Sequence, residues 1–310
     1  MGTPEQAKKI IPNNRRLLQL FIIAAVLTGL LLMSLFPRPA GSWPMIFRAL
    51  HLSAGWNPHT PTFTFLDVGQ GDSALIRSGE WAVLVDGGTD GADLCRELRR
   101  QGVTKLHYLI ATHPHADHIG GLGMAAEAFD AGTLLITDTP PAEEADAAYY
   151  NRLLEKAAER DMAVIHPQDG DVFDIGDIHL EIMHSMPAAQ NENDRSMFVR
   201  ARTGGVTALI TGDAEEDAEA AALRSGRDLS ADILKVGHHG SKNSTSERFL
   251  AAVHPRYAVI SVGAGNAYGH PTDQTLERLS AADIVIYRTD LDGTICFETQ
   301  TTEAGPRDAA

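Results

Sequence analysis

Short apolar runs alternate with longer amphipathic segments from residue 62 to residue 297. Short apolar runs predict β-strands, and apolar residues recurring every three or four positions predict helices. Strands are expected at 62–66, 73–77, 82–85, 108–111, 134–137, 163–165, 179–183, 197–202, 208–211, 233–236, 258–262, 285–287 and 294–297, and helices at 92–101, 122–129, 142–161, 214–225, 246–253 and 272–281. This order predicts an α/β (α+β) fold in which two mixed sheets lie between outer helices, a four-layer αββα sandwich.

The segment 17–36 is dominated by apolar residues and carries no charge. About 20 such residues can cross a bilayer, and the basic residues before them predict a cytoplasmic N-terminus. We therefore expect a single-pass cell-membrane protein whose main domain is extracytoplasmic. A cleaved signal peptide would instead give a secreted protein, but Arg38-Pro39-Ala40 is a poor cleavage site. The expected divisions are a basic N-terminus at 1–16, a transmembrane signal anchor at 17–36, a linker at 37–61, the main domain at 62–300 and a flexible tail at 301–310.

Acidic residues outnumber basic ones, with 41 Asp and Glu against 26 Lys and Arg, and the formal net charge is −15. Residues 1–16 carry a net +3, so the rest of the chain carries −18. Broad electrostatic capture of nucleic acid depends on Lys and Arg, so this charge disfavours it. The same charge is compatible with binding metal cations. Two cysteines cannot form a disulfide framework.

Four residues of metal-ligating types occur within six positions, shortly after the strand expected at 108–111. They are His113, His115, Asp117 and His118, and Gly120 and Gly121 follow them. In an extended chain, residues two apart point to the same side, so His113 and His115 can hold one metal ion. Asp117 and His118 lie in the turn before the next helix and can hold a second. Such a concentration at a strand end predicts a two-metal site.

With these residues, the chain resembles the metallo-β-lactamase-fold hydrolases, and among them the extracytoplasmic domain of the ComEC family of DNA-uptake competence proteins. The motifs that carry the resemblance are FLDVGQGDS at 65–73, LVDGG at 84–88, THPHADHIGG at 112–121, NDRS at 193–196, TGD at 211–213, LKVGHHGSK at 234–242, YGHP at 268–271 and TDLDG at 289–293. The resemblance implies the αββα fold. ComEC proteins also carry a multi-span pore domain, whereas one apolar span is present here. We therefore expect a stand-alone relative of the hydrolase domain, which leaves a role in DNA uptake open.

The remaining metal ligands are expected at other strand ends. Asp213 follows the strand at 208–211, and the resemblance places the bridging carboxylate there. Either His238 or His239 should complete the second metal's ligands. The Gly-His order favours His238, which leaves His239 as a catalytic residue that holds substrate or donates a proton. His270 is a further candidate for substrate binding.

The first metal has fewer expected ligands. Many relatives place a histidine at its third position, whereas this chain offers only His184 or Asn193 as weak ligands. A softly held metal suggests Mn²⁺ as well as Zn²⁺, because oxygen ligands and open positions suit manganese. Asp86 is expected to orient a ligand histidine from behind. Ser241 and Lys242 are expected to assist substrate binding.

The implied chemistry is hydrolysis by a hydroxide formed between two divalent cations, Zn²⁺ or Mn²⁺, that share Asp213 and lower the pKa of water. Asp117, His239 and Asp86 are the expected catalytic residues. The resemblance favours a phosphodiester substrate, with single-stranded DNA as the candidate polymer, and the sequence identifies no protein partner. Two alternatives stay open: a phosphodiesterase acting on wall polymers such as teichoic acid, and a non-catalytic DNA-binding domain related to competence.

Overall fold

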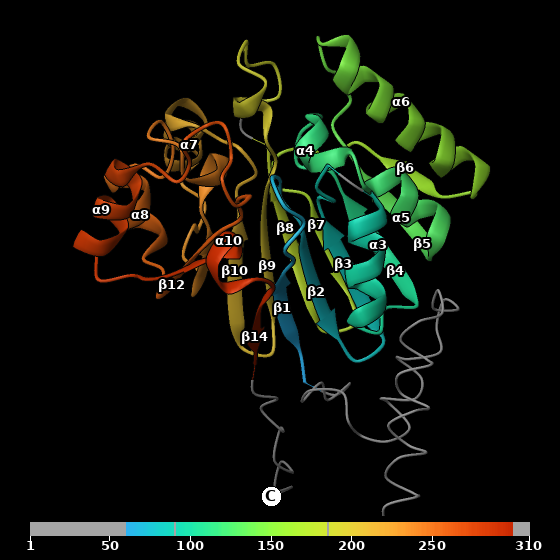
Figure 1. Ribbon diagram of the computed structural model, residues 1–310, viewed down its shortest axis with the longest axis horizontal. Coiled ribbons are helices and arrows are strands. Elements are labelled where there is room, and N and C mark those ends of the chain that lie inside the picture. Colours follow the sequence, from blue (N-terminus) through green and yellow to red (C-terminus); the bar gives the residue numbers. More distant parts are fainter. Residues whose placement is uncertain (1–59, 90, 185, 300–310) are drawn as a thin grey trace, which may run out of the picture. The chain divides into compact units, whose positions relative to one another are not determined.

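The computed structural model describes residues 60–89, 91–184 and 186–299 (Figure 1). The expected N-terminal segment at 1–16, the anchor at 17–36, nearly all of the linker and the tail at 301–310 lie outside the described residues. Within the described ranges, no helix combines the length and the apolar character that crossing a membrane requires.

The first sheet has seven strands in the order β14-β1-β2-β3-β4-β5-β6. Their bounds are β1 Thr62–Phe65, β2 Ala74–Ser78, β3 Trp81–Val85, β4 Lys105–Ile110, β5 Asp130–Leu135, β6 Ala163–Ile165 and β14 Ile295–Glu298. Neighbouring strands are antiparallel from β14 to β3 and parallel from β3 to β6.

The second sheet also has seven strands, in the order β13-β12-β11-β10-β9-β8-β7. Their bounds are β7 Val172–Ile175, β8 Ile178–Met183, β9 Phe198–Thr203, β10 Val206–Ile210, β11 Ile233–Lys235, β12 Tyr257–Ile260 and β13 Val285–Arg288. Neighbours are antiparallel from β7 to β10 and parallel from β10 to β13. Each sheet therefore has a parallel half, and in open α/β sheets the loops at the carboxyl ends of such strands are where ligands bind.

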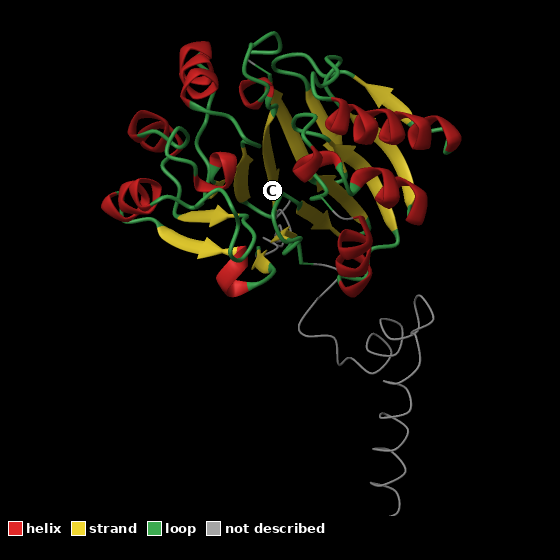
Figure 2. Cartoon of the chain, turned by 45° about the horizontal axis from the view of Figure 1, so that its top comes forward, coloured by secondary structure: helices red, strands yellow, loops and turns green. Residues whose placement is uncertain are grey.

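Helices cover the outer face of each sheet (Figures 1 and 2). The longer ones are α3 Gly91–Arg100, α5 Leu122–Ala128 and α6 Glu144–Glu159 beside the first sheet, and α7 Glu216–Ser225, α8 Glu247–Val253 and α9 Asp273–Ala281 beside the second. Short helical turns are α4 Ala116–Ile119, η1 Asn193–Arg195, η2 Gly237–Gly240 and α10 Thr289–Asp292.

Strand periodicity accounts for the layers. Along β3, Leu84 joins the core under the first helix layer, whereas Val83 and Val85 join the core between the sheets. Along β10, Leu209 faces the second helix layer, and Ile210 faces the inter-sheet core. Successive strand side chains point to opposite faces, so each central strand contributes to two cores. The three cores confirm the predicted two-sheet sandwich.

One strand and the four short helical turns α4, α10, η1 and η2 were not predicted from the pattern. Strand β7 is a short edge strand with exposed and half-buried side chains, so it lacks an apolar run. The turns α4 and α10 have four residues each, too few to show helical periodicity. Strand β5 begins at Asp130, whereas the sequence predicted a start at residue 134. Its first four residues are polar or small and are exposed or half-buried, so they show no apolar run.

Candidate metal centre

The predicted metal-ligating residues follow the parallel strands of both sheets. His113 comes after β4, and Asp117 and His118 lie in α4. Asp213 comes after β10, and His238 and His239 lie in the turn η2 after β11. His113, His118, Asp213 and His239 are each at most 2% exposed. The topology therefore brings ligand-type residues from both sheets to one buried edge.

Four of these residues form a compact group: Asp117, His118, Asp213 and His239 have ligand atoms all within 4.8 Å of one another. The Nε2 atom of His118 lies 3.1 Å from Oδ1 of Asp213. The Nε2 atom of His239 lies 3.2 Å from Oδ2 of Asp117 and 3.4 Å from Oδ2 of Asp213. Asp213 thus lies between two histidines, and we call these four residues the metal group.

His238 and His239 occupy different surroundings although they are adjacent. Both have positive φ, 45° and 51°, so the turn η2 directs the two side chains differently. His239 enters the metal group, and its Nδ1 lies 2.8 Å from the carbonyl oxygen of Ser261. His238 places Nδ1 2.9 Å from Oε1 of Glu215, and its Nε2 is 3.7 Å from Oδ2 of Asp213. The geometry favours His239 over His238 as a ligand, the reverse of the preference taken from the Gly-His order.

His113 and His115 form a pair beside the metal group. Their Nε2 and Nδ1 atoms are 3.1 Å apart, and the rings of His113 and His118 are 4.1 Å apart between centroids. The Nε2 atom of His115 also lies 3.3 Å from Oε2 of Glu192, a residue for which the sequence predicted no role. Among the described residues, this pair belongs to no compact group of three acidic, histidine or cysteine ligands. The first metal position is therefore the less complete one.

The two weak-ligand candidates lie in different places. The buried ring of His184 contacts the carbonyl oxygen of Arg195 through Nε2, at 3.1 Å, so that nitrogen is already engaged by the backbone. Asn193 is closer to the site, with Nδ2 3.5 Å from Nδ1 of His238. The Oδ1 atom of Asn193 is buried without a hydrogen-bond partner among the described residues. Of the two, Asn193 has the better position for a ligand.

Asp86 lies directly behind His118. It is fully buried, and its Oδ2 is 2.9 Å from Nδ1 of His118. The same carboxylate accepts hydrogen bonds from the backbone N–H and the hydroxyl of Thr112, at 2.8 and 2.7 Å. These contacts fix the ring of His118 with Nε2 directed at Asp213, as expected of a carboxylate that orients a ligand histidine.

Lys235 and Asp72 form a buried ion pair behind the other histidine of the metal group. Lys235 is 1% exposed and Asp72 is 3% exposed, and Oδ1 of Asp72 lies 3.2 Å from Nδ1 of His239. No role for Lys235 was predicted from the sequence, although a lysine inside the apolar run ILKV indicates a buried charge that needs a partner. Its ammonium group compensates the carboxylate that supports His239.

The predicted substrate residues lie at varying distances from the metal group. The ring of His270 is 5.4 Å from that of His238, so His270 borders the site. The hydroxyl of Ser241 accepts a hydrogen bond from the backbone N–H of Asn243, and Lys242 is exposed. No contact described here joins Ser241 or Lys242 to the metal group.

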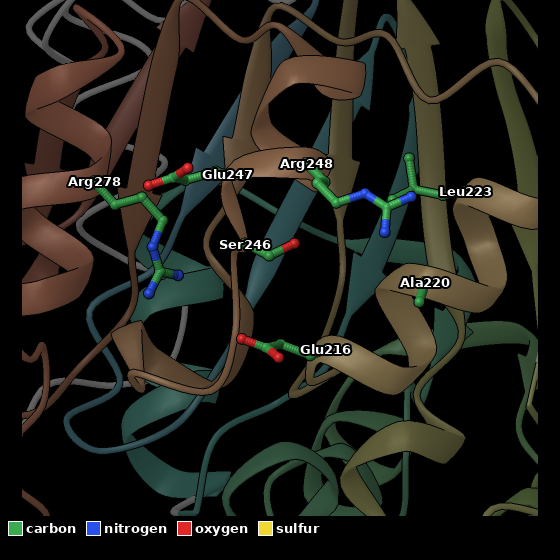
Figure 3. Close-up of a pocket in the computed structure, with 7 residues that line it drawn as sticks. All are labelled: Glu216, Ala220, Leu223, Ser246, Glu247, Arg248 and Arg278. Carbon is green, nitrogen blue, oxygen red and sulfur yellow. The ribbon is translucent and has the colours of Figure 1, made fainter.

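A surface pocket between α7, α8 and α9, lined by residues that include Glu216, Arg248 and Arg278, contains none of the predicted site residues (Figure 3).

The electrostatics of the metal group favour cations. Burial alone would lower the pKa of His118 and His239, but the nearby carboxylates, Asp213 foremost, raise both well above the ordinary value. Burial alone would raise the pKa of Asp213, but the two histidines hold it well below the ordinary range. The carboxylates thus stabilise positive charge at the metal group. Divalent cations can supply that charge in place of the protons on the histidines.

The donor set also fits metal ions. The Nε2 atom of His118 and Oδ1 of Asp213 are buried and lack hydrogen-bond partners among the described residues, although they lie 3.1 Å apart. Buried polar atoms rarely remain unpaired. Imidazole and carboxylate are the ligands that Zn²⁺ and Mn²⁺ use. The site contains four carboxylates, those of Asp72, Asp86, Asp117 and Asp213. Lys235 balances the charge of Asp72 alone, so net negative charge is left for cations to neutralise.

Comparisons with known proteins agree with this geometry. The chain is 33% identical to ComE operon protein 3 of Bacillus subtilis, over 75% of this chain and 32% of that protein. It is 32% identical to competence protein ComA of Neisseria gonorrhoeae, over 89% of this chain and 38% of that protein. The resemblance to ComEC-type competence proteins is thereby confirmed, and the chain spans about a third of the length of these relatives.

A solved structure and a family profile identify the fold. The metallo-β-lactamase fold protein YhfI of Bacillus subtilis superposes with a TM-score of 0.54 at 15% identity, covering 77% of this chain and 99% of that one. Residues 66–264 match the profile of the metallo-beta-lactamase superfamily, and this range includes every residue of the metal group. The chain therefore belongs to the metallo-β-lactamase superfamily.

Proposed function

We propose that this domain is a metal-dependent phosphodiesterase that acts on single-stranded DNA. The observation that carries the proposal is the buried metal group, in which Asp117, Asp213, His118 and His239 converge from both sheets. The names of the relatives support a nucleic-acid substrate, because two of them are competence proteins and a third is recombination protein 2 of Haemophilus influenzae.

The metal group would hold one divalent cation, and His113, His115 and Asp213 would hold a second. Bound Zn²⁺ or Mn²⁺ supplies Lewis acidity and lowers the pKa of water. Around the metal group, Asp86 orients His118, and the pair of Asp72 and Lys235 supports His239. His238 is fixed through Nδ1 by Glu215 and presents Nε2 towards the site, so we assign it the proton transfer to the leaving oxygen.

The net charge limits the kind of nucleic acid. Outside residues 1–16 the chain carries −18, and Glu192 and Glu215 lie next to predicted site residues. Duplex DNA held by its phosphates requires many Lys and Arg contacts. A flexible single strand needs fewer of them, because it can place one phosphodiester at the metal group while its bases contact neighbouring side chains.

The test is hydrolysis by the purified full-length chain after chelation and reloading with Mn²⁺ or Zn²⁺. The substrates are a fluorescent oligothymidylate and bis(p-nitrophenyl) phosphate. Both should be cleaved only with metal. The Asp213→Asn variant should lose at least about 100-fold in rate, since even residues behind metal ligands typically contribute about 10- to 100-fold.

Asp174→Asn is the matched control, because Asp174 is a surface carboxylate on β7 that pairs with His179. It should leave the rate unchanged. Cleavage of the small diester alone would point to a wall-polymer or small-molecule esterase. Cleavage of neither substrate, with metal bound and oligothymidylate bound, would point to a non-catalytic DNA-binding domain.

We further propose that residues 17–36 anchor the chain in the cell membrane with the domain extracytoplasmic. The support is the uncharged apolar run and the basic residues that precede it. Cys296 is exposed and Cys95 is buried, so a membrane-impermeant maleimide should label intact cells that express the native chain but not the Cys296→Ser variant. Labelling that requires cell lysis would contradict the proposed orientation.

A further inference from the structure

An exposed aromatic side chain lies next to His270, the histidine that neighbours His238. Tyr268 is 69% exposed and lies in the loop between β12 and α9. Its ring is stacked on that of His270, with centroids 6.0 Å apart and planes at 26°. Aromatic rings usually bury most of their apolar surface, so the ring of Tyr268, beside the half-buried His270, is unusually open.

One side chain holds this loop in place. The Oδ1 atom of Asn266 accepts the backbone N–H groups of Tyr268 and His270, both at 3.1 Å. Its Nδ2 donates to the carbonyl oxygens of His270, at 2.6 Å, and Gly263, at 3.2 Å. The two aromatic residues are therefore presented at a fixed spacing, which lowers the entropic cost of binding a flat ligand.

The loop is also joined to the turn that carries the metal-group histidine. The backbone N–H of Thr272 donates to the carbonyl oxygen of Gly240 at 3.0 Å. The ring of His270 lies 5.4 Å from that of His238, which itself approaches Asp213. The Nδ1 atom of His270 is buried and has no hydrogen-bond partner among the described residues. A ligand that extends from the metal group past His238 would thus meet the exposed ring of Tyr268, whereas Nδ1 of His270 has no exposed surface of its own.

We propose that Tyr268 and His270 form a nucleobase-stacking subsite, which holds the base of a nucleotide adjoining the scissile phosphodiester. The proposal rests on the phosphodiesterase function proposed above and adds a selectivity for bases. Stacking on aromatic side chains gives affinity that tolerates any base sequence and requires no positive charge. That suits an acidic chain, which gains little from phosphate contacts. A polyol-phosphate polymer has no base and gains nothing from the subsite.

The experiment compares the full-length chain with its Tyr268→Ala and Tyr268→Phe variants on two polymers of equal length. One polymer is oligothymidylate, and the other carries abasic tetrahydrofuran residues on the same phosphodiester backbone. Tyr268→Ala should raise KM for oligothymidylate by about 5- to 100-fold and leave the abasic polymer unaffected. Tyr268→Phe should behave as the native chain does. Leu291→Ala is the matched control, because Leu291 is 70% exposed on α10, outside the loop.

A second readout measures binding without turnover. In calorimetry with the native chain, thymidine 5′-monophosphate should bind more tightly than deoxyribose 5-phosphate, and Tyr268→Ala should abolish the difference. Equal losses on both polymers, or an unchanged KM for oligothymidylate, would overturn the stacking subsite. If the native chain cleaves neither polymer, the phosphodiesterase proposal fails, and the calorimetric difference then decides whether the stacking subsite exists.

Discussion

Glu219 couples the pH to the stability of the segment that follows the metal-group histidine. It lies on α7 and is 2% exposed. Its two carboxylate oxygens accept the backbone N–H groups of Thr245 and Ser246, the latter at 2.9 Å. Arg278 holds the same segment from the other side, donating to the carbonyl oxygens of Ser244 and Thr245 at 2.6 and 2.7 Å. Ser246 and Arg278 are visible together in Figure 3.

Burial raises the pKa of Glu219 from its ordinary 4.5 to about 7, although the hydrogen bonds from Ser246 and Thr245 oppose the change. Below pH 4.5 the carboxyl is protonated in both the folded and the unfolded chain. Between pH 4.5 and about 7 the unfolded chain releases this proton and the folded chain retains it. Stability is therefore lost as the pH rises through this window. Each tenfold difference in proton affinity is worth about 1.4 kcal/mol, so the loss is roughly 3 kcal/mol.

The perturbation is Glu219→Gln, which removes the titration. One of its hydrogen bonds is lost as well, since the amide NH₂ cannot accept from a backbone N–H, but that cost does not depend on pH. Urea unfolding in the presence of chelator, at several values from pH 4.5 to 8, should show the native chain losing roughly 3 kcal/mol relative to the variant.

Glu247→Gln serves as the matched control, because Glu247 is exposed in the first turn of α8. The free energy of unfolding of this variant should change with pH by the same amount as that of the native chain. If the free energies of unfolding of Glu219→Gln and the native chain also differ by a constant amount across the pH range, the carboxyl does not titrate where burial places it, and the reasoning is refuted.

Further substitutions probe the metal group and the residues that surround it. His239→Ala should lower the amount of Mn²⁺ or Zn²⁺ retained per chain after dialysis, measured by elemental analysis, and His238→Ala should not. The opposite result would identify His238 as the ligand, as the Gly-His order predicted. Asp86→Asn should weaken metal affinity by about 10- to 100-fold in competition with a chelating dye, and an unchanged affinity would remove its orienting role. Lys235→Met should cost about 3–5 kcal/mol in urea unfolding, because it leaves the buried carboxylate of Asp72 without its lysine counter-ion. The double variant with Asp72→Asn should recover most of that loss, and equal losses in both would count against the ion pair.

The layers of the fold were predictable because apolar alternation reports burial directly. In β3 and β10 each side chain reveals which core it joins by its position in the strand. The edge strand β7 escaped prediction for the same reason, since its side chains are exposed or half-buried and leave no apolar run. Periodicity therefore locates the central strands better than the edges of the sheets.

The site was predictable as far as it depends on strand ends. His113, Asp117 and Asp213 each stand directly after an apolar run or in the turn that follows it. The choice between His238 and His239 depends on two consecutive positive φ angles in the turn η2, and a sequence pattern does not report dihedral angles. The base-stacking role of Tyr268 likewise depends on exposure and ring orientation, which the motif YGHP does not encode.

The buried negative charge at the metal group is balanced in two different ways. The counter-ion of Asp72 is the ammonium group of Lys235. Because it is a side chain of the same protein, it cannot diffuse away as a bound metal ion can. Asp117 and Asp213 face histidines that can carry protons or yield their nitrogen atoms to metal ions. Asp72 thus stays neutralised whether or not a metal is bound, whereas the histidines that face Asp117 and Asp213 exchange their protons for cations. Removal of the metals should therefore leave the two sheets packed, since their shared core is apolar and the one buried lysine of the site keeps its partner.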